Sequence, residues 1–116
     1  PLGISAREQV AFLSRLANDE LPLSPDTLRA GKAIMRADGD GDWSLYAKTG
    51  WGLRPGEPDI GWYVGWVEQA AGDVWVFALN LDMPDDATRA KRIPVTRAVL
   101  AALGAIPADP EPQERR

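Results

Sequence analysis

Residues 60–82 read IGWYVGWVEQAAGDVWVFALNLD, a run with two candidate strands joined by a short connection. In the first, Ile60 to Glu68, both faces carry apolar side chains: Ile60, Trp62, Val64 and Trp66 on one, Tyr63 and Val67 on the other. The second, Val74 to Asp82, is almost wholly apolar as far as Leu79. Ala71-Gly72-Asp73 between them is typical of a hairpin. Strands that are apolar on both faces predict a sheet covered on both faces.

A third strand is predicted upstream, from Trp43 to Thr49, and the Gly- and Pro-rich segment 51–59 after it predicts a loop. Residues 38–42, Asp-Gly-Asp-Gly-Asp, resemble the start of a calcium-binding loop. The sixth position of such a loop must be Gly but is Trp43, and the twelfth must be Glu but is Thr49. We therefore predict an Asp-Gly turn here and no metal site.

Helical patterns flank the strands. Ser5 and Glu8 form a capping box. The apolar stripe that follows is Val10, Phe12, Leu13, Leu16 and Ala17. Ser24 and Pro25 are favourable residues at the start of a second helix. Its weaker apolar face is Leu28, Ala33, Ile34 and Met35. A last helix, which Gly104 is expected to end, carries Val95, Val99, Leu100 and Leu103 on one side.

The order helix-helix-strand-strand-strand-helix predicts an α+β fold, an antiparallel sheet covered by helices. We assign residues 1–106 to this unit and expect 107–116, rich in Pro and charge, to be a disordered tail. Three short helices cover little of a sheet that is apolar on both faces, and both sheet edges would be open. The first residue is Pro1 rather than Met. We therefore expect part of a larger domain.

Composition excludes several classes of function. The 116 residues contain no His and no Cys, so a Ser-His-Asp triad, a His-ligated metal, a disulfide and thiol catalysis are all ruled out. A net charge of −4 disfavours nucleic acid as a partner. No apolar run reaches the roughly 18–20 residues of a membrane span.

Lys48-Thr49-Gly50 at the end of the first strand is the motif with a chemical rationale. It offers a positive charge, a hydroxyl and an open backbone to one ligand, and Gly50 permits close approach. A small anionic ligand lying along the strand fits this set. The alternative is an ordinary exposed strand end.

From Pro1 to about Ile106 the chain resembles the C-terminal portion of class D (oxacillinase-type) serine β-lactamases, in the β-lactamase/penicillin-binding transpeptidase-like superfamily. The stretches that carry this resemblance are Glu8–Leu13, Glu20–Pro22, Lys48–Trp51, Gly61–Glu68 and Phe77–Met83. The resemblance implies the C-terminal part of that fold, with hydrolysis of a β-lactam amide through an acyl-serine as the activity of the whole enzyme. It also implies a periplasmic or secreted location.

The resemblance implies roles for individual residues. Lys48 would favour the β-lactam carboxylate and support the proton network, and Thr49 would hydrogen-bond that carboxylate, with Gly50 beside them in the substrate-binding strand. The backbone amide of Trp51 would supply half of the oxyanion hole.

The family also carries an arginine early in the last helix that pairs with the substrate carboxylate. Arg92 fits that position best, and Arg89, one helical turn earlier, is the alternative.

The family's nucleophile and base lie in a Ser-x-x-Lys motif, which this chain lacks: the residues three after Ser5, Ser14, Ser24 and Ser44 are Glu8, Ala17, Thr27 and Ala47. The family's Ser-x-Val and Tyr-Gly-Asn motifs are also absent. We therefore expect the N-terminal part of the same domain as a partner, no activity of this chain alone, and no cofactor in it, since the lysine that the family carboxylates with CO2 is missing. A β-lactam is the expected ligand, and a homodimer is a candidate assembly.

Other interpretations remain open at this level. The matching part of a β-lactam sensor domain would be acylated but not turned over. An autonomous interaction domain would use the Trp-rich sheet. Glu68 and Asp82 on neighbouring strands form a weaker candidate for a paired-carboxylate hydrolase. We expect Trp51 to line the site and the other four Trp residues to pack in the interior.

Overall fold

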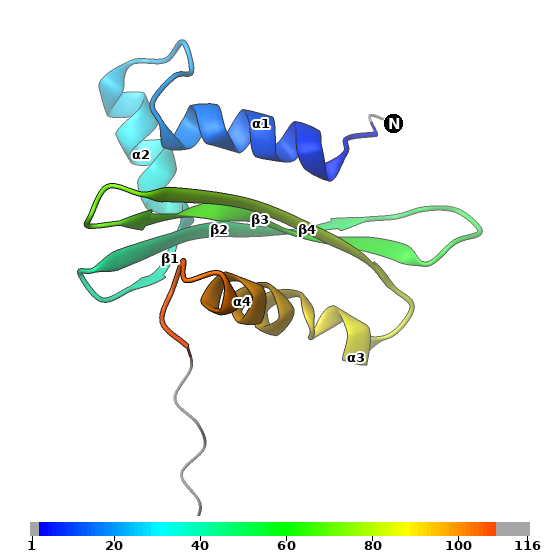
Figure 1. Cartoon of the computed structure of the whole chain (residues 1–116). Coiled ribbons are helices and arrows are strands. Elements are labelled where there is room, and N and C mark those ends of the chain that lie inside the picture. Colours follow the sequence, from blue (N-terminus) through cyan, green and yellow to red (C-terminus); the bar gives the residue numbers. More distant parts are fainter. Residues whose placement is uncertain (1–2, 109–116) are drawn as a thin grey trace, which may run out of the picture.

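The computed structural model describes residues 3–108, which form a four-stranded antiparallel sheet with helices on both faces (Figure 1). The elements are α1 (Ala6–Ala17), α2 (Pro25–Met35), β1 (Arg36–Gly39), β2 (Trp43–Gly52), β3 (Asp59–Gln69), β4 (Val74–Met83), α3 (Asp86–Arg89) and α4 (Arg92–Ala102). The strands lie in the order β1-β2-β3-β4. The α+β class and the antiparallel sheet are therefore confirmed. Residues 109–116 of the expected tail lie outside the described residues.

The structure adds β1 and the one-turn helix α3 to the predicted elements. Strand β1 carries Arg-Ala-Asp-Gly, which has no apolar alternation, and it exists through its pairing with Ser44, Leu45 and Tyr46 across a bulge. Strand β2 also continues three residues past Thr49, because Gly50, Trp51 and Gly52 pair with Trp62, Gly61 and Ile60. The expected loop 51–59 is thus the tip of a β2–β3 hairpin that projects beyond the helices (Figure 1).

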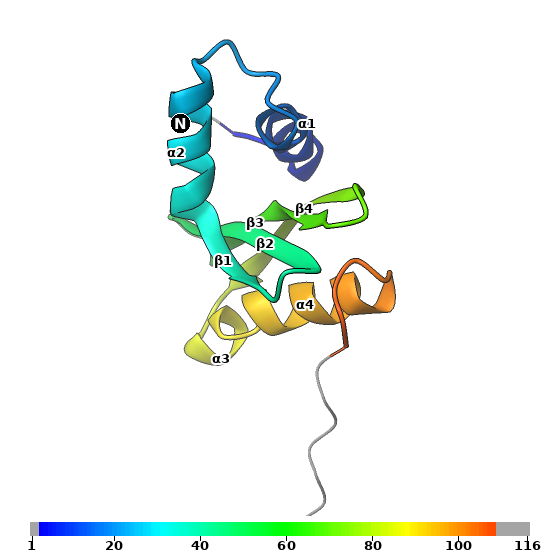
Figure 2. The same cartoon turned by 90° about the vertical axis from the view of Figure 1, so that its left-hand side faces the viewer.

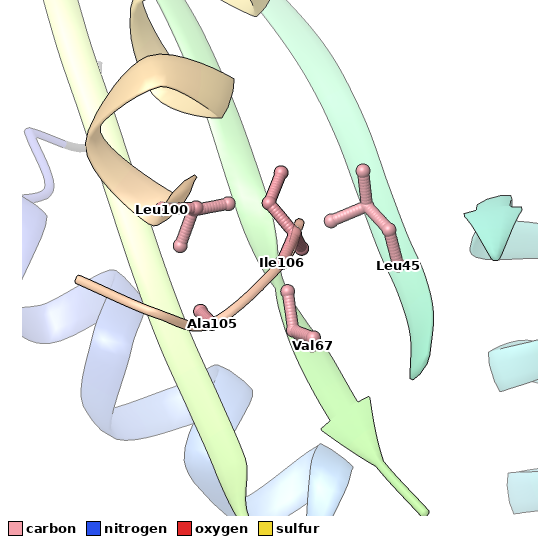
Figure 3. Packing of buried hydrophobic residues seen from close by; sticks show 5 residues of the cluster. All are labelled: Leu45, Val67, Leu100, Ala105 and Ile106. Carbon is pink, nitrogen blue, oxygen red and sulfur yellow. The ribbon is translucent and has the colours of Figure 1, made fainter. Parts of the chain in front are cut away.

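Two small cores lie on opposite faces of the sheet, as the alternation in β3 predicts. Figure 2 shows the sheet edge-on between α1 on one side and α4 on the other. Trp66 is buried against Leu13 and Ala17 of α1. On the other face the buried cluster is Leu45, Val67, Leu100, Ala105 and Ile106 (Figure 3).

The helix ends follow the predicted capping chemistry. Ser5 Oγ accepts from the Glu8 amide at 3.1 Å, and Glu8 Oε1 accepts from the Ser5 amide at 3.1 Å. Ser24 Oγ accepts from the Thr27 amide at 3.2 Å at the start of α2. Gly104, with φ of +83°, follows the end of α4, where a left-handed residue stops a helix.

The apolar faces of the helices are narrower than predicted. Phe12, Ile34, Val95, Val99 and Leu103 are 50%, 85%, 42%, 52% and 58% exposed. Helix α4 buries Leu100, as predicted, and also Thr96. The reason is that α4 packs near the free edge of β4, so Val99 and Leu103 line a groove of about 390 Å³ along that edge rather than the core.

Candidate functional site

The Lys48–Trp51 segment lies on an open strand edge. Strand β1 pairs with β2 only from Ser44 to Tyr46, whereas the pairing of β2 with β3 continues to Gly52. Within residues 3–108, no strand lies on the other side of the Lys48–Gly52 stretch. The backbone of this stretch can therefore receive an extended ligand, as exposed sheet edges do.

The strand divides its side chains between the two faces of the sheet. Thr49 is opposite Tyr63 and Lys48 is opposite Val64. Tyr63 packs against Phe77 on the α4 face, and Val64 packs in the Trp66 cluster on the α1 face. Thr49 and Trp51 therefore project toward the α4 face and Lys48 toward the α1 face.

Arg92, the first residue of α4, reaches this strand from the α4 face of the sheet, past Gly61 of β3. Its Nη1 donates to the Gly50 carbonyl oxygen at 3.0 Å, and its Nε donates to the Arg89 carbonyl oxygen at 3.2 Å. A Cβ at Gly61 of β3 would lie 2.9 Å from Arg92 Cδ. The absence of a side chain at Gly61 therefore leaves room for the aliphatic part of the Arg92 side chain. Arg92 is only partly buried, and no carboxylate of the described residues forms an ion pair with it.

The strand pairing defines the direction of the Trp51 amide. The carbonyl of Gly50 and the N–H of Trp51 belong to one trans peptide and point in opposite directions. The Ala70 amide next to β3 donates to the Asp42 carbonyl oxygen at 2.8 Å, so in this unbroken register the carbonyl of Gly50 points toward β3 and the Trp51 N–H points toward the open edge. Lys48 Nζ donates to the Thr49 carbonyl oxygen at 3.0 Å, and alternate carbonyls of a strand point to opposite edges. The Lys48 ammonium and the Trp51 amide therefore share the open edge.

The Trp51 side chain is half exposed and contacts two residues that lie apart from it in sequence. Its Nε1 donates to Asp59 Oδ2 at 2.8 Å across the hairpin, and the Arg89 guanidinium carbon lies 5.0 Å from its ring centroid. Arg89 also pairs with Asp86 at 2.6 Å. Sequence reasoning did not single out Asp59, because only the hairpin pairing brings it to Trp51.

The structure does not bring together Glu68 and Asp82, the candidate pair of catalytic carboxylates. Glu68 accepts from Trp66 Nε1 at 3.0 Å and pairs with Lys32 at 3.3 Å, whereas Asp82 pairs with Arg54 at 2.6 Å. Asp82 lies opposite Ile60. It is thus eight residues along β3 from Glu68, about 26 Å away along the strand. Glu68 and Asp82 therefore cannot act on one bond.

Asp38 and Tyr63, both in strands of the sheet, have shifted pKa values. The pKa of Asp38 is lowered, first by the hydrogen bond from the Gly39 amide to its Oδ1 at 2.8 Å and then by Arg97 at 2.9 Å. Asp38 lies in β1, so the predicted turn begins only after Gly39, and the Asp38 carboxylate is engaged by the Gly39 amide and Arg97 while still partly exposed. Burial raises the pKa of Tyr63, which faces α4 opposite Thr49.

No group of three or more His, Cys, Asp and Glu residues suited to hold a metal occurs between residues 3 and 108. Over the same residues, every helix is too short or too polar to cross a membrane.

Comparison with known proteins identifies the relatives of this chain. The family profile of the penicillin-binding protein transpeptidase domain matches residues 2–101. The chain is 44% identical to β-lactamase OXA-2 of Salmonella typhimurium over 112 residues, which is 94% of this chain and 38% of that protein. It is 42% identical to β-lactamase OXA-48 of Klebsiella pneumoniae over 106 residues, 91% of this chain and 39% of that protein.

Solved structures agree. The class D β-lactamase YbXI from Nostoc superposes with a TM-score of 0.83 at 42% identity, covering 91% of this chain and 44% of that one. FUS-1 (OXA-85), a class D β-lactamase from Fusobacterium nucleatum subsp. polymorphum, gives a TM-score of 0.84 at 35% identity, covering 91% and 43%. The chain spans less than half the length of each of these relatives.

Proposed function

The chain belongs to the penicillin-binding protein transpeptidase domain family and is homologous to class D β-lactamases, and from this premise we propose that it forms the substrate-binding strand region of a β-lactam-hydrolysing serine enzyme. The ligand is a β-lactam, and the proposed binding residues are Thr49, Gly50 and Arg92. Lys48 and the Trp51 backbone amide take the catalytic roles.

The observation that supports this most is the contact of Arg92 with the Gly50 carbonyl, which brings helix α4 to the strand end that carries Lys48. A carboxylate at this strand end would meet the Thr49 hydroxyl and a guanidinium that has no acidic partner among residues 3–108. Arg89 is the weaker candidate for the carboxylate, because Asp86 and the Trp51 ring already engage its guanidinium.

The proposed chemistry is acyl transfer. A serine attacks the β-lactam carbonyl, the amide C–N bond breaks, and water then hydrolyses the acyl-serine ester. The Trp51 N–H stabilises the oxyanion that develops on the carbonyl oxygen in both steps. Lys48 Nζ, on the same edge, favours the negative charge of the substrate and supports proton transfer to the departing nitrogen.

The serine and the general base are to come from a segment with a Ser-x-x-Lys motif, which is absent from these 116 residues. We therefore propose that residues 1–106 complete a domain together with that N-terminal part. A periplasmic or secreted location is part of the same proposal.

A chimera tests the proposal. This chain replaces the homologous C-terminal segment of β-lactamase OXA-2, to which it is 44% identical. We expect the chimera to hydrolyse nitrocefin and Lys48→Ala to abolish turnover. Arg92→Ala should raise KM well above the value for Arg89→Ala, and a larger effect of Arg89→Ala would reverse the assignment.

The 116-residue chain alone should not hydrolyse nitrocefin above the buffer rate, because it holds no Ser-x-x-Lys nucleophile and base. Turnover by the purified chain would contradict the proposed division of the active site. In the chimera, acylation without turnover would favour the sensor-domain alternative.

A further inference from the structure

We propose that Arg92 polarises and orients the Gly50–Trp51 peptide, whose N–H is the oxyanion donor, and that Asp59 and Arg89 fix the side chain of the same tryptophan. This inference rests on the proposed function and extends it, because Arg92 gains a role beyond carboxylate binding. Asp59 and Arg89 become positioning residues.

The first part follows from one hydrogen bond. Arg92 Nη1 donates to the Gly50 carbonyl at 3.0 Å, and a guanidinium donor makes a charge-assisted bond. Electron density drawn toward the carbonyl oxygen leaves the N–H of the same peptide a stronger donor, and such coupling strengthens a hydrogen bond by roughly 10–30%. Together with the pairing of Gly50 with Trp62, the bond also holds the peptide plane, so the Trp51 N–H is aimed at the open edge before any ligand arrives.

The second part concerns the side chain of Trp51. An indole that is 53% exposed at a hairpin would ordinarily change rotamer freely. Here Asp59 accepts from Nε1 at 2.8 Å, and the Arg89 guanidinium lies over the ring with its carbon 5.0 Å from the centroid. Asp86 in turn holds Arg89 at 2.6 Å.

The contacts to the Trp51 backbone and the contacts to its side chain are connected through Arg92 and Arg89. The Arg89 carbonyl accepts from Arg92 Nε at 3.2 Å, so the arginine that contacts Gly50 is tied to the arginine that covers Trp51. The backbone and the side chain of Trp51 are therefore held by the same α3–α4 junction. An oxyanion donor gains from being fixed in this way, because no reorganisation is needed when charge develops.

The first test is NMR of the isotope-labelled 116-residue chain. In Arg92→Ala, the Gly50 carbonyl carbon should move upfield and the Trp51 amide proton should change, whereas Arg92→Lys, which keeps a cationic donor, should restore part of the shift. Arg29→Ala, which removes an exposed arginine paired with Asp26, is the control and should leave both signals in place. Unchanged Gly50 and Trp51 signals in Arg92→Ala would overturn the proposal, whatever the enzyme activity.

The second test separates the two roles of Arg92 by kinetics of the chimera with nitrocefin. Thr49→Val, which removes only a carboxylate contact, should raise KM with kcat nearly unchanged. Arg92→Ala should raise KM and also lower kcat about tenfold, less than the roughly 10²–10³-fold that follows removal of an oxyanion donor. A rise in KM alone would overturn the polarising role and leave the proposed function intact, whereas an inactive parent chimera would count against the proposed function itself.

Two substitutions of Asp59 test whether this residue positions the Trp51 side chain. Asp59→Ala should lower kcat several-fold and speed hydrogen exchange at Trp51 Nε1, because the acceptor is lost. Asp59→Asn keeps an acceptor oxygen and should restore both values. Equal behaviour of the two variants would show that Asp59 does not position Trp51.

Discussion

Gly61 illustrates how one residue without a side chain makes room for the site. A Cβ at this position would meet Met83 and would lie 2.9 Å from Arg92 Cδ. The sequence places Gly61 in an apolar strand but does not show that an arginine from a helix further along the chain passes beneath it. Position 61 requires glycine for steric reasons, because a side chain there would collide with Arg92 of the site as well as with Met83 of the neighbouring strand.

Gly61→Ala should therefore destabilise the chain by about 1–3 kcal/mol, the usual cost of overpacking. Gly31→Ala is the matched control, because a Cβ there meets nothing within 4 Å and alanine favours a helix by roughly 0.5–1 kcal/mol. Urea denaturation of the two variants measures both effects. Equal stability of Gly61→Ala and the parent chain would mean that Met83 and Arg92 move aside freely.

Tyr63 predicts a dependence of stability on alkaline pH. Burial raises its pKa above the usual value of 10.0, so the folded state holds the phenol proton more tightly than the unfolded state. That stability is complete below about pH 10 and is lost as the pH rises from there through the raised pKa. The midpoint temperature of thermal unfolding, measured from pH 8 to 11.5, should therefore fall more steeply for the parent chain than for Tyr63→Phe. Parallel curves for the two proteins would contradict this prediction.

At the scale of elements, sequence patterns predict those helices and strands whose own side chains favour the observed conformation and burial. The two-sided apolar run around Trp66 and Val67 gives a sheet with a core on each face, and the Ser5 capping box gives the start of α1. Strand β1 was missed because its residues gain their conformation from pairing with β2 alone.

The sequence predicts the buried face of α4 only in part, at Leu100, and for a different reason. Periodicity identifies an apolar stripe, but it does not say which side of the helix meets the sheet, and Val99 remains exposed at the sheet edge. The site shows the same limit, because the Arg92–Gly50 contact joins residues 42 positions apart. The family resemblance implies Arg92 as the residue that binds the carboxylate, whereas the contact of Arg92 with the Gly50–Trp51 peptide is visible only in the structure.

Ser5→Ala should cost about 1 kcal/mol of stability, because it removes the side chain that accepts from the Glu8 amide. Ser14→Ala lies within the same helix, away from the cap, and should be nearly neutral. Chemical denaturation and the helical signal in circular dichroism compare the two variants. A smaller loss for Ser5→Ala than for Ser14→Ala would show that the cap does not limit α1.

The whole molecule is flat, with extents of 51 × 41 × 21 Å. Its Cα radius of gyration is 15.8 Å, compared with about 13 Å for a compact domain near this length. Much apolar surface stays exposed along the free edge of β4, where Val99 and Leu103 line the groove. An open apolar edge strand is a site of association.

The chain alone should therefore associate as its concentration rises, and the double variant Val99→Lys/Leu103→Lys should stay monomeric to higher concentration. Sedimentation velocity over a concentration series measures this directly. If both proteins associate equally, the contact between copies lies elsewhere, and a homodimer through another surface becomes the better proposal.

The most direct measurement is a crystal structure of the chimera acylated by a β-lactam. The acyl carbonyl oxygen should lie within about 2.7–3.1 Å of the Trp51 amide nitrogen. The β-lactam carboxylate should lie at the Thr49 hydroxyl and the Arg92 guanidinium, with Arg92 still in reach of the Gly50 carbonyl. A carboxylate bound to Arg89, or an acyl oxygen that points away from Trp51, would contradict the proposed site.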